Sequence, residues 1–523
     1  MLEKTKITLD DLYRSLKVHD KEILKRFDDK TLDDQQYLFY AINFDIISNA
    51  LSLVIAIETD NLDCFGVDNS CRTIIEAFVV LRMIAAGDIS DEQAKIFRYH
   101  YAIVDYTNMY KFIDDKLRLH EDFKYVEKDR EAAYKAILSL HNCTKSDLKK
   151  DPDLDNSNFY LKKKLGGKLR FSVLLKQYPI FDVCDSKMYD FFSLFIHPRY
   201  EFDFKIEESL RNVRTEYVNR VLDYVVSYMS ETKLFVLDES LNTFKQDFYE
   251  NPILKNNVLN INVMNRVFES IKKKTCYFSE GYDAFSMFFL DRMREVITDM
   301  QVSISLGYKE HIISLFKSTI EYIAVYSLIN ECETVEKFKK MKLAYCYSSR
   351  LQINALLGGL GLPAIFGEET IGGLRQLFDD YYKEQYSIDN FDLFVKNVTN
   401  NARYFLNKDN NSFNNIVNKL LDDLYPNPQE REFTRLIYRI SKDMNHGGGY
   451  AFNSSPGLID SQCRHVQNAI YRYMLYYLNE SERTLKENGI NVDLTFEKKT
   501  FELLAAAEET EIEKVKKEYS NKK

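Results

Sequence analysis

CRTIIEAFVVLRMI, residues 71–84, has a counterpart far along the chain in FKSTIEYIAVYSLI, residues 316–329. Each stretch carries a cation followed four residues later by a glutamate: Arg72 and Glu76 in the first, Lys317 and Glu321 in the second. Residues four apart lie on one face of a helix, so the two stretches predict two helices of the same design. A similarity at this separation indicates an internal duplication.

A second pair of similar stretches follows in the same order. YDFFSLFIH spans residues 189–197 and YRISKDMNH spans residues 438–446, and each begins with tyrosine and ends with histidine. Two landmarks repeated in one order, at nearly the same separation, are hard to obtain by chance. We therefore predict a pseudo-dimer in one chain, with related halves at residues 1–250 and 251–496 and a charged helical tail at residues 497–523.

The composition favours an all-α fold. The 523 residues include only 8 prolines and 17 glycines. No proline precedes Pro152 and none lies between Pro252 and Pro363, so long helices can run through both regions. Apolar residues spaced by three and four predict a buried helix over residues 38–57, and Gly87 is expected to end the next helix.

Charge and motifs exclude several classes of protein. A formal net charge of -9 argues against a protein whose whole surface binds nucleic acid. The 8 cysteines contain no CxxC pair and the chain contains no HExxH motif, so we expect neither a metal nor a cofactor. The start lacks the apolar run of a signal peptide, and charges interrupt the apolar stretches short of the roughly 18 residues that a membrane span needs. We expect a soluble, cytoplasmic protein.

The histidines that close the second pair of stretches have two interpretations. A histidine in the last turn of a helix is favoured by the helix dipole, and a proline or glycine follows each one, so His197 and His446 can be structural. Glu76 has apolar neighbours and is expected to be buried, and a buried carboxylate needs partners. We therefore predict that Glu76 meets His197 and that Glu321 meets His446.

These motifs carry a resemblance. A helix with the pattern [RK]-[ST]-x-x-E, followed much later by a helix that ends in His-Pro or His-Gly, resembles a bacterial family of helical proteins of uncharacterised function. That family is similar to the HEPN (higher eukaryotes and prokaryotes nucleotide-binding) superfamily, and the likeness covers most of both halves through short motifs. HEPN ribonucleases carry arginine, four to six residues and then histidine, and two copies usually meet to form one site.

Arg439 and His446 match the arginine-histidine motif of that superfamily, with six residues between them. The chain also departs from it, because Ile440 stands where a polar residue is usual and Asp190 stands at the position of Arg439 in the first half. The resemblance implies a metal-independent endoribonuclease of a toxin or phage-defence system. His446 would move a proton, Arg439 would stabilise the charge of the phosphorane, and Glu321 would belong to the same site.

The alternative is a non-catalytic helical scaffold that binds RNA, a nucleotide or a protein. The glutamate-histidine pairs would then hold the bundles together, and the cleft between the two repeats would take the partner, with His197, Glu76 and Arg72 as binding residues. Lys164 and Lys168 belong to the basic run LKKKLGGKLR, residues 161–170, which could hold phosphate but is more often a solvated loop. The sequence does not identify the partner, and it does not decide whether the chain forms a homo-oligomer.

Overall fold

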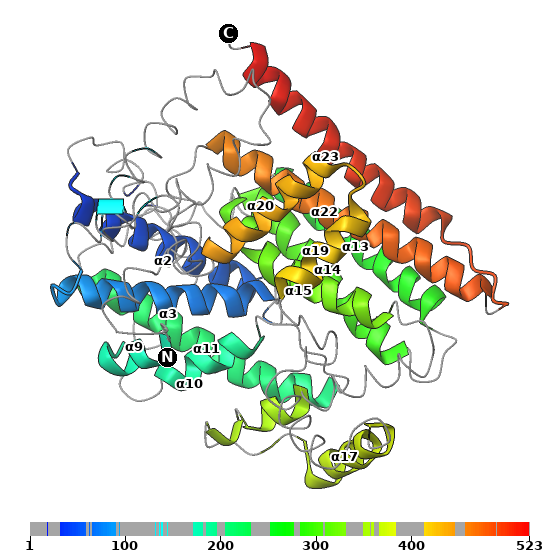
Figure 1. Ribbon diagram of the computed structural model, residues 1–523, viewed down its shortest axis with the longest axis horizontal. Helices are drawn as coiled ribbons and strands as arrows, with labels where there is room; N and C mark the ends of the chain where they lie inside the picture. The colour runs from blue at the N-terminus through cyan, green and yellow to red at the C-terminus, as the bar shows by residue number, and fades with distance from the viewer. Residues whose placement is uncertain are drawn as a thin grey trace.

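A computed structural model of the chain shows helices throughout the part that it describes (Figure 1), and that part contains no β-strand. This confirms the all-α class. Apart from isolated positions, the described residues are 32–58, 65–89, 171–180, 185–195, 204–231, 252–276, 283–306, 309–330, 349–355, 366–382, 413–444, 456–487 and 489–521. The expected boundary near residue 250 lies outside them.

The helices of the first half are α2 (Asp34–Glu58), α3 (Phe65–Ala85), α9 (Phe171–Gln177), α10 (Asp185–Phe195) and α11 (Phe204–Glu231). Those of the second half are α13 (Pro252–Thr275), α14 (Asp283–Leu306), α15 (Lys309–Asn330), α17 (Glu368–Tyr382), α19 (Phe413–Leu424), α20 (Pro428–Met444) and α22 (Pro456–Glu487). The helix α23 (Thr495–Asn521) follows them.

Local sequence signals set the bounds of the first two helices. Asp33 and Gln36 form a reciprocal capping box at the start of α2, each side chain accepting a hydrogen bond from the other residue's backbone N–H. Gly87 ends α3 as expected, with a φ of 71° that a residue bearing a side chain adopts at a cost. The Gly87 and Asp88 N–H groups bond back to the carbonyls of Ile84 and Met83, which is the Schellman arrangement.

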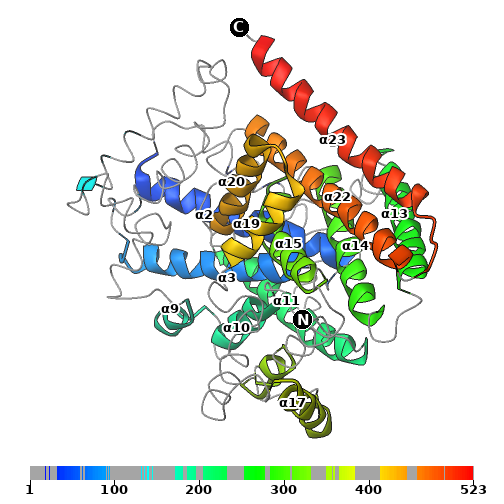
Figure 2. The ribbon, with the colours of Figure 1, turned by 45° about the vertical axis from the view of Figure 1, so that its right-hand side comes forward.

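Each half is built around the helix that contains the repeated cation and glutamate. In the first half α2, α10 and α11 all pack on α3, so that α3 lies between α2 on one side and α9 to α11 on the other (Figures 1 and 2). In the second half α14, α19, α20 and α22 pack on α15. The helices α3 and α15 also contact each other, so the two halves meet through their central helices.

In the described part of the chain, two helical segments are long and apolar enough to span a membrane by length and composition alone, namely Asp34–Ile57 and His311–Ile329. This differs from the expectation that charges interrupt every apolar stretch. Most of each segment, 78% and 94% of its most apolar window, is buried among other helices of the protein. Both segments therefore occupy the positions of core helices.

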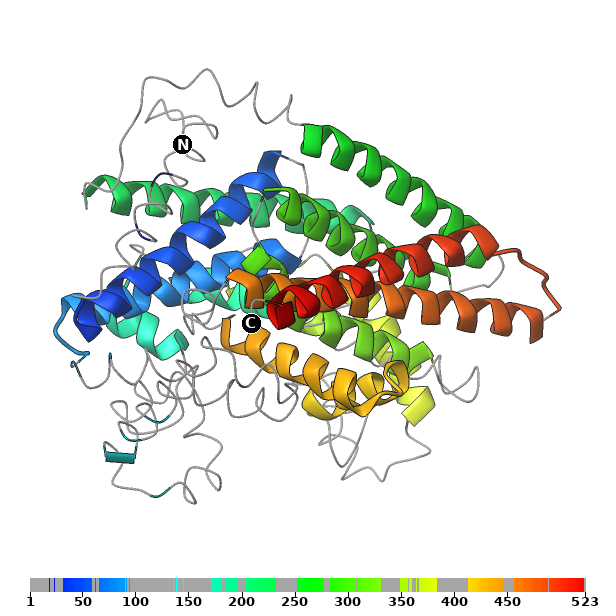
Figure 3. The same cartoon turned by 90° about the horizontal axis from the view of Figure 1, so that it is seen from above.

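The charged helix α23 packs on the second half through its first turns. Phe501 and Ala505 are buried there, and the buried Glu497 accepts a hydrogen bond of 2.7 Å from Lys274 of α13. Seen from above, α22 and α23 (orange to red) run beside α13 (green) at one side of the molecule (Figure 3). The far end of α23 stands clear of the other helices (Figure 1).

Candidate functional site

The repeated glutamate of the first half lies in a buried network. Glu76 Oε1 accepts a hydrogen bond of 2.9 Å from Arg72 Nε and one of 2.7 Å from the Tyr189 hydroxyl of α10. Burial and the adjacent Glu76 carboxylate raise the pKa of Tyr189, so its hydroxyl stays protonated and donates. Burial alone would lower the pKa of Arg72, but Glu76 and Tyr189 outweigh it and raise that pKa.

The second half repeats this tyrosine-glutamate bond with a weaker ion pair. The Tyr438 hydroxyl of α20 donates to Glu321 Oε1 over 2.8 Å. Lys317 takes the position of Arg72, but its Nζ stays 3.9 Å from Glu321 Oε2, beyond hydrogen-bond distance. Tyr189 and Tyr438 were missed as functional residues by the sequence analysis, although both begin the repeated stretches that end in histidine.

Lys317 interacts electrostatically with charged groups of both glutamate networks. Burial lowers the pKa of Lys317 to about 8, and Glu321 opposes this shift. The charges of Arg72 and Lys442 lower the pKa further, and Glu76 opposes them, so groups from α3, α15 and α20 lie close enough to interact. We call these residues the junction cluster: Arg72, Glu76, Tyr189, Lys317, Glu321, Tyr438 and Lys442.

The junction cluster continues to the surface along α20. Lys442 is partly buried, donates to Asn414 Oδ1 over 3.0 Å and lies 5.4 Å from the centre of the Tyr438 ring. Burial lowers the pKa of Lys442, Glu321 opposes that shift, and Arg439 adds to it. Arg439 itself is exposed and has no hydrogen bond or ion pair with another described residue. Three cationic side chains of increasing exposure therefore follow one another here: Lys317 is buried, Lys442 is partly buried and Arg439 is exposed.

Four of the predicted site residues lie outside the described residues: His197, His446, Lys164 and Lys168. The structure places Arg72, Glu76 and Glu321 together at the junction of the halves and Arg439 on the surface near them. The prediction that the glutamates meet His197 and His446 therefore stays a prediction. What the structure adds is that a tyrosine donates to each glutamate.

A second inter-half contact joins the start of α3 to the second half. His311 Nε2 lies 3.0 Å from Asp299 Oδ2, and both side chains lie next to Gly66, at the place where a Cβ of that residue would be. A Cβ at Gly66 would lie 2.5 Å from Asp299 Oδ2, which is too close for any side chain without movement. Gly66 and His311 are aligned by the same offset as Arg72 and Lys317, so the two repeated stretches carry different residues at this contact.

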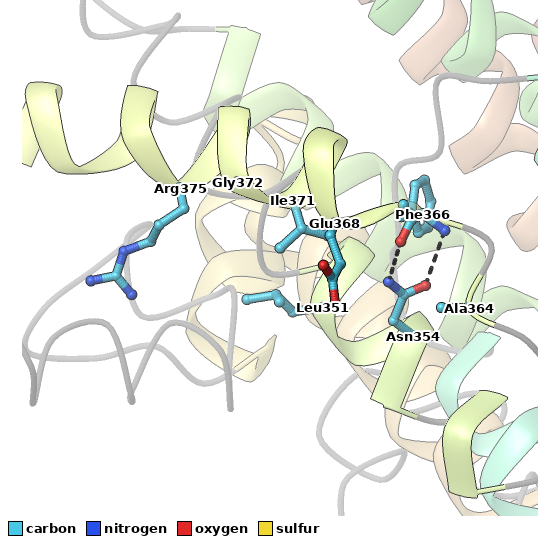
Figure 4. Close-up of a pocket in the computed structure, with 9 residues that line it drawn as sticks. Leu351, Asn354, Ala364, Phe366, Glu368, Ile371, Gly372 and Arg375 are labelled. Atoms are coloured by element: carbon cyan, nitrogen blue, oxygen red, sulfur yellow. Dashed lines mark hydrogen bonds between the residues drawn. The ribbon is translucent and has the colours of Figure 1, made fainter.

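A surface cavity of about 610 Å³ lies between residues 351–354 and the first turns of α17 (Figure 4). The Asn354 amide bridges the backbone N–H and carbonyl of Phe366 at its edge, and Arg375 is paired with Asp379 over 2.8 Å. The Asn354 and Arg375 side chains are thus committed to internal contacts. Within the described part of the chain, no group of histidine, cysteine and acidic residues could hold a metal ion.

Comparison with known proteins gives no further guidance on the site. The chain matches no protein-family model, no curated protein and no solved structure. The geometry of the junction cluster and of Arg439 is therefore the basis for a functional proposal.

Proposed function

We propose that the chain is a HEPN-like pseudo-dimer that cleaves RNA without a metal, in a toxin or phage-defence setting, with Arg439 and His446 as its catalytic pair. The position of Arg439 supports this most. Its side chain is exposed and unpaired among the described residues, which leaves its N–H donors available to a phosphate. The residue before it, Tyr438, is buried and bonded to Glu321, which fixes this turn of α20.

The proposed reaction uses the RNA's own 2′-hydroxyl. Its oxygen attacks the adjacent phosphorus while His446 takes its proton, and the bond from phosphorus to the 5′-oxygen breaks. The leaving 5′-oxygen takes a proton from water, so the products are a 2′,3′-cyclic phosphate and a 5′-hydroxyl. Arg439 stabilises the negative charge that builds up on the phosphorane oxygens. Glu321 is 1% exposed and bonded to Tyr438, so its role in this scheme is to position α20 rather than to touch RNA.

The two halves differ where the catalytic arginine is proposed. Asp190 of α10 stands at the position of Arg439, and Ser193 stands at the position of Lys442. Asp190 is exposed, as Arg439 is, so a carboxylate replaces a cation at the same place on an equivalent helix. A carboxylate repels phosphate, and we therefore propose one catalytic centre per chain, in the second half.

A second candidate function is the non-catalytic scaffold that binds RNA, a nucleotide or a protein. The burial of the tyrosine-glutamate bonds in both halves favours it, because buried hydrogen bonds between helices serve to fix helix packing. In this candidate function Arg439 and Lys442 bind the ligand, and no bond is broken.

The two candidates are separated by incubating purified full-length protein with a labelled RNA pool in EDTA. We expect cleavage to 2′,3′-cyclic phosphate ends by the wild type, and a loss of about 100-fold or more in Arg439→Ala and His446→Ala. Arg483→Ala is the matched control, because Arg483 is an exposed arginine on α22 and should leave the rate unchanged. Each variant's melting temperature verifies its fold.

RNA that stays intact with the wild type, while binding is retained, would reject the ribonuclease and support the scaffold. Cleavage that persists in folded Arg439→Ala and His446→Ala would place the activity elsewhere in the chain.

A further inference from the structure

We infer that Lys317 and Lys442 form a phosphate-binding site at the junction of the two halves. The site is separate from the proposed catalytic pair and would bind a phosphate group whether or not the protein cleaves RNA. Its two lysines come from α15 and α20, the two helices that the Tyr438–Glu321 hydrogen bond joins.

The first argument is the weak pairing of the Lys317 ammonium. Its side chain is only 5% exposed, yet among the described residues Nζ has no hydrogen-bond partner and only a 3.9 Å ion pair with Glu321. A buried ammonium has three donors to satisfy, and leaving them without partners is costly. Arg72, at the equivalent position, bonds its glutamate directly over 2.9 Å. An anion beside Lys317 would supply the acceptors that this half lacks.

The second argument is the balance of charge. The junction cluster contains three cations, Arg72, Lys317 and Lys442, and two carboxylates, Glu76 and Glu321. Each carboxylate also accepts a tyrosine hydroxyl, so part of its capacity to bond a cation is already used. Among the described residues of the junction cluster one positive charge is therefore left over, and a phosphodiester carries one negative charge.

The third argument is the graded exposure of the cations. Arg439 is exposed, Lys442 is partly buried and Lys317 is buried, so the positive charge leads inward from the surface of α20. A phosphate group has several oxygens and can accept from two ammonium groups at once, which a single halide or a hydroxyl cannot do as well. The first half has no counterpart to this path, because Ser193 replaces Lys442.

Two probes test the site by titration calorimetry of the full-length protein. The first is a deoxyadenosine dinucleotide, whose phosphodiester has no neighbouring 2′-hydroxyl and so cannot be cleaved by the proposed reaction. The second is inorganic phosphate. Binding of the dinucleotide points to a nucleic-acid backbone as the natural ligand, and binding of inorganic phosphate alone points to a free phosphate. We expect Lys317→Met and Lys442→Met each to lose about tenfold or more in affinity.

The matched control is Lys486→Met, which removes an exposed lysine from the last turn of α22 and should change the affinity less than about twofold. Retained affinity in Lys317→Met, or no binding of either probe by the wild type, would overturn the inference. Because the dinucleotide cannot be cleaved, its binding remains measurable even if the ribonuclease proposal fails.

Proton uptake gives a second readout that a purely structural lysine would not show. The pKa of Lys317 is about 8 in the free protein, so roughly half of the ammonium is deprotonated at pH 8. A bound phosphodiester favours the ammonium, and binding at pH 8 should therefore take up about half a proton, measured in buffers of different ionisation enthalpy. At pH 6 the uptake should vanish. Lys317→Arg should bind the dinucleotide without uptake, and an uptake that Lys317→Arg retains would contradict the assignment.

Discussion

Arg72 and Lys317 occupy equivalent positions but satisfy their charges differently. The guanidinium of Arg72 reaches Glu76 over 2.9 Å, whereas the ammonium of Lys317 stays 3.9 Å from Glu321. Burial lowers the folded-state pKa of Lys317 to about 8, below its ordinary value of 10.5. The unfolded chain therefore binds more protons than the folded protein between these two values, and stability due to this group rises with pH across that window.

Lys317→Met should consequently be more stable than the wild type at pH 7, by about 3 kcal/mol in free energy of unfolding. The difference should shrink as pH rises from 8 toward 10.5, where the lysine becomes neutral in both states. Urea denaturation of both proteins at several pH values measures this, and tyrosine ionisation cancels because both proteins share it. A difference that stays constant with pH would contradict the lowered pKa.

The tyrosine-glutamate bonds should be equally important in the two halves. Tyr189→Phe and Tyr438→Phe each remove one buried donor to a carboxylate, and each should lower the free energy of unfolding by about 1.5 to 3 kcal/mol. Tyr40→Phe is the control, because Tyr40 is partly exposed and has no hydrogen bond to another described residue. Chemical denaturation of the three variants measures this, and a loss in only one half would show that the equivalence is superficial.

At these positions the sequence predicted burial but not the partner. Glu76 was expected inside because its neighbours are apolar, and it is 1% exposed. The donor from α10 could not be deduced, since which residue of a repeated stretch faces the glutamate depends on how its helix is rotated. Tyr189 of α10 donates to Glu76 of α3, whereas the predicted partner His197 lies outside the described residues.

Among the elements, α3 shows both what a pattern can predict and what it cannot. Its end was predicted from Gly87, and the positive φ of that glycine confirms it. Its first turns are polar, yet Asp68, Asn69 and Ser70 are all buried. A sequence pattern assigns such residues to a solvated face. They are covered here because other helices pack on α3 from both halves, which no local pattern encodes.

Replacing a glycine by alanine should have opposite effects on stability at the end of α3 and inside α17. Gly87→Ala places a side chain at a φ of 71° and should lower the free energy of unfolding by about 1 kcal/mol. Gly372 lies inside α17 with open space around its Cα, so Gly372→Ala should be neutral or raise helix stability by up to about 1 kcal/mol. Thermal melts followed by circular dichroism compare them, and equal losses would show that the cost is not conformational.

On the scale of the whole molecule, the helical class was predicted from the sequence and is confirmed, and the duplication stays a prediction. The way the two halves meet was not predicted. Repeated stretches indicate equivalent helices, and α3 and α15 are each the central helix of their half. Their mutual contact depends on differences between the copies. Gly66 stands at the position of His311, and Arg72 stands at the position of Lys317. The prediction used only the residues that the two stretches have in common, so it could not include these differences.

The contact at Gly66 tests this junction directly. Gly66→Ala would bring a Cβ to 2.5 Å from Asp299 Oδ2, so it should lower the free energy of unfolding by about 1 to 3 kcal/mol. Asp299→Ala removes the obstructing oxygen, and the double variant should therefore cost less than the two single changes together. Gly358→Ala is the control, because nothing lies within 4 Å of the added Cβ. The coupling is measured by a double-mutant cycle. If the two losses simply add, α3 does not pack against the Asp299–His311 pair, and the halves meet in another way.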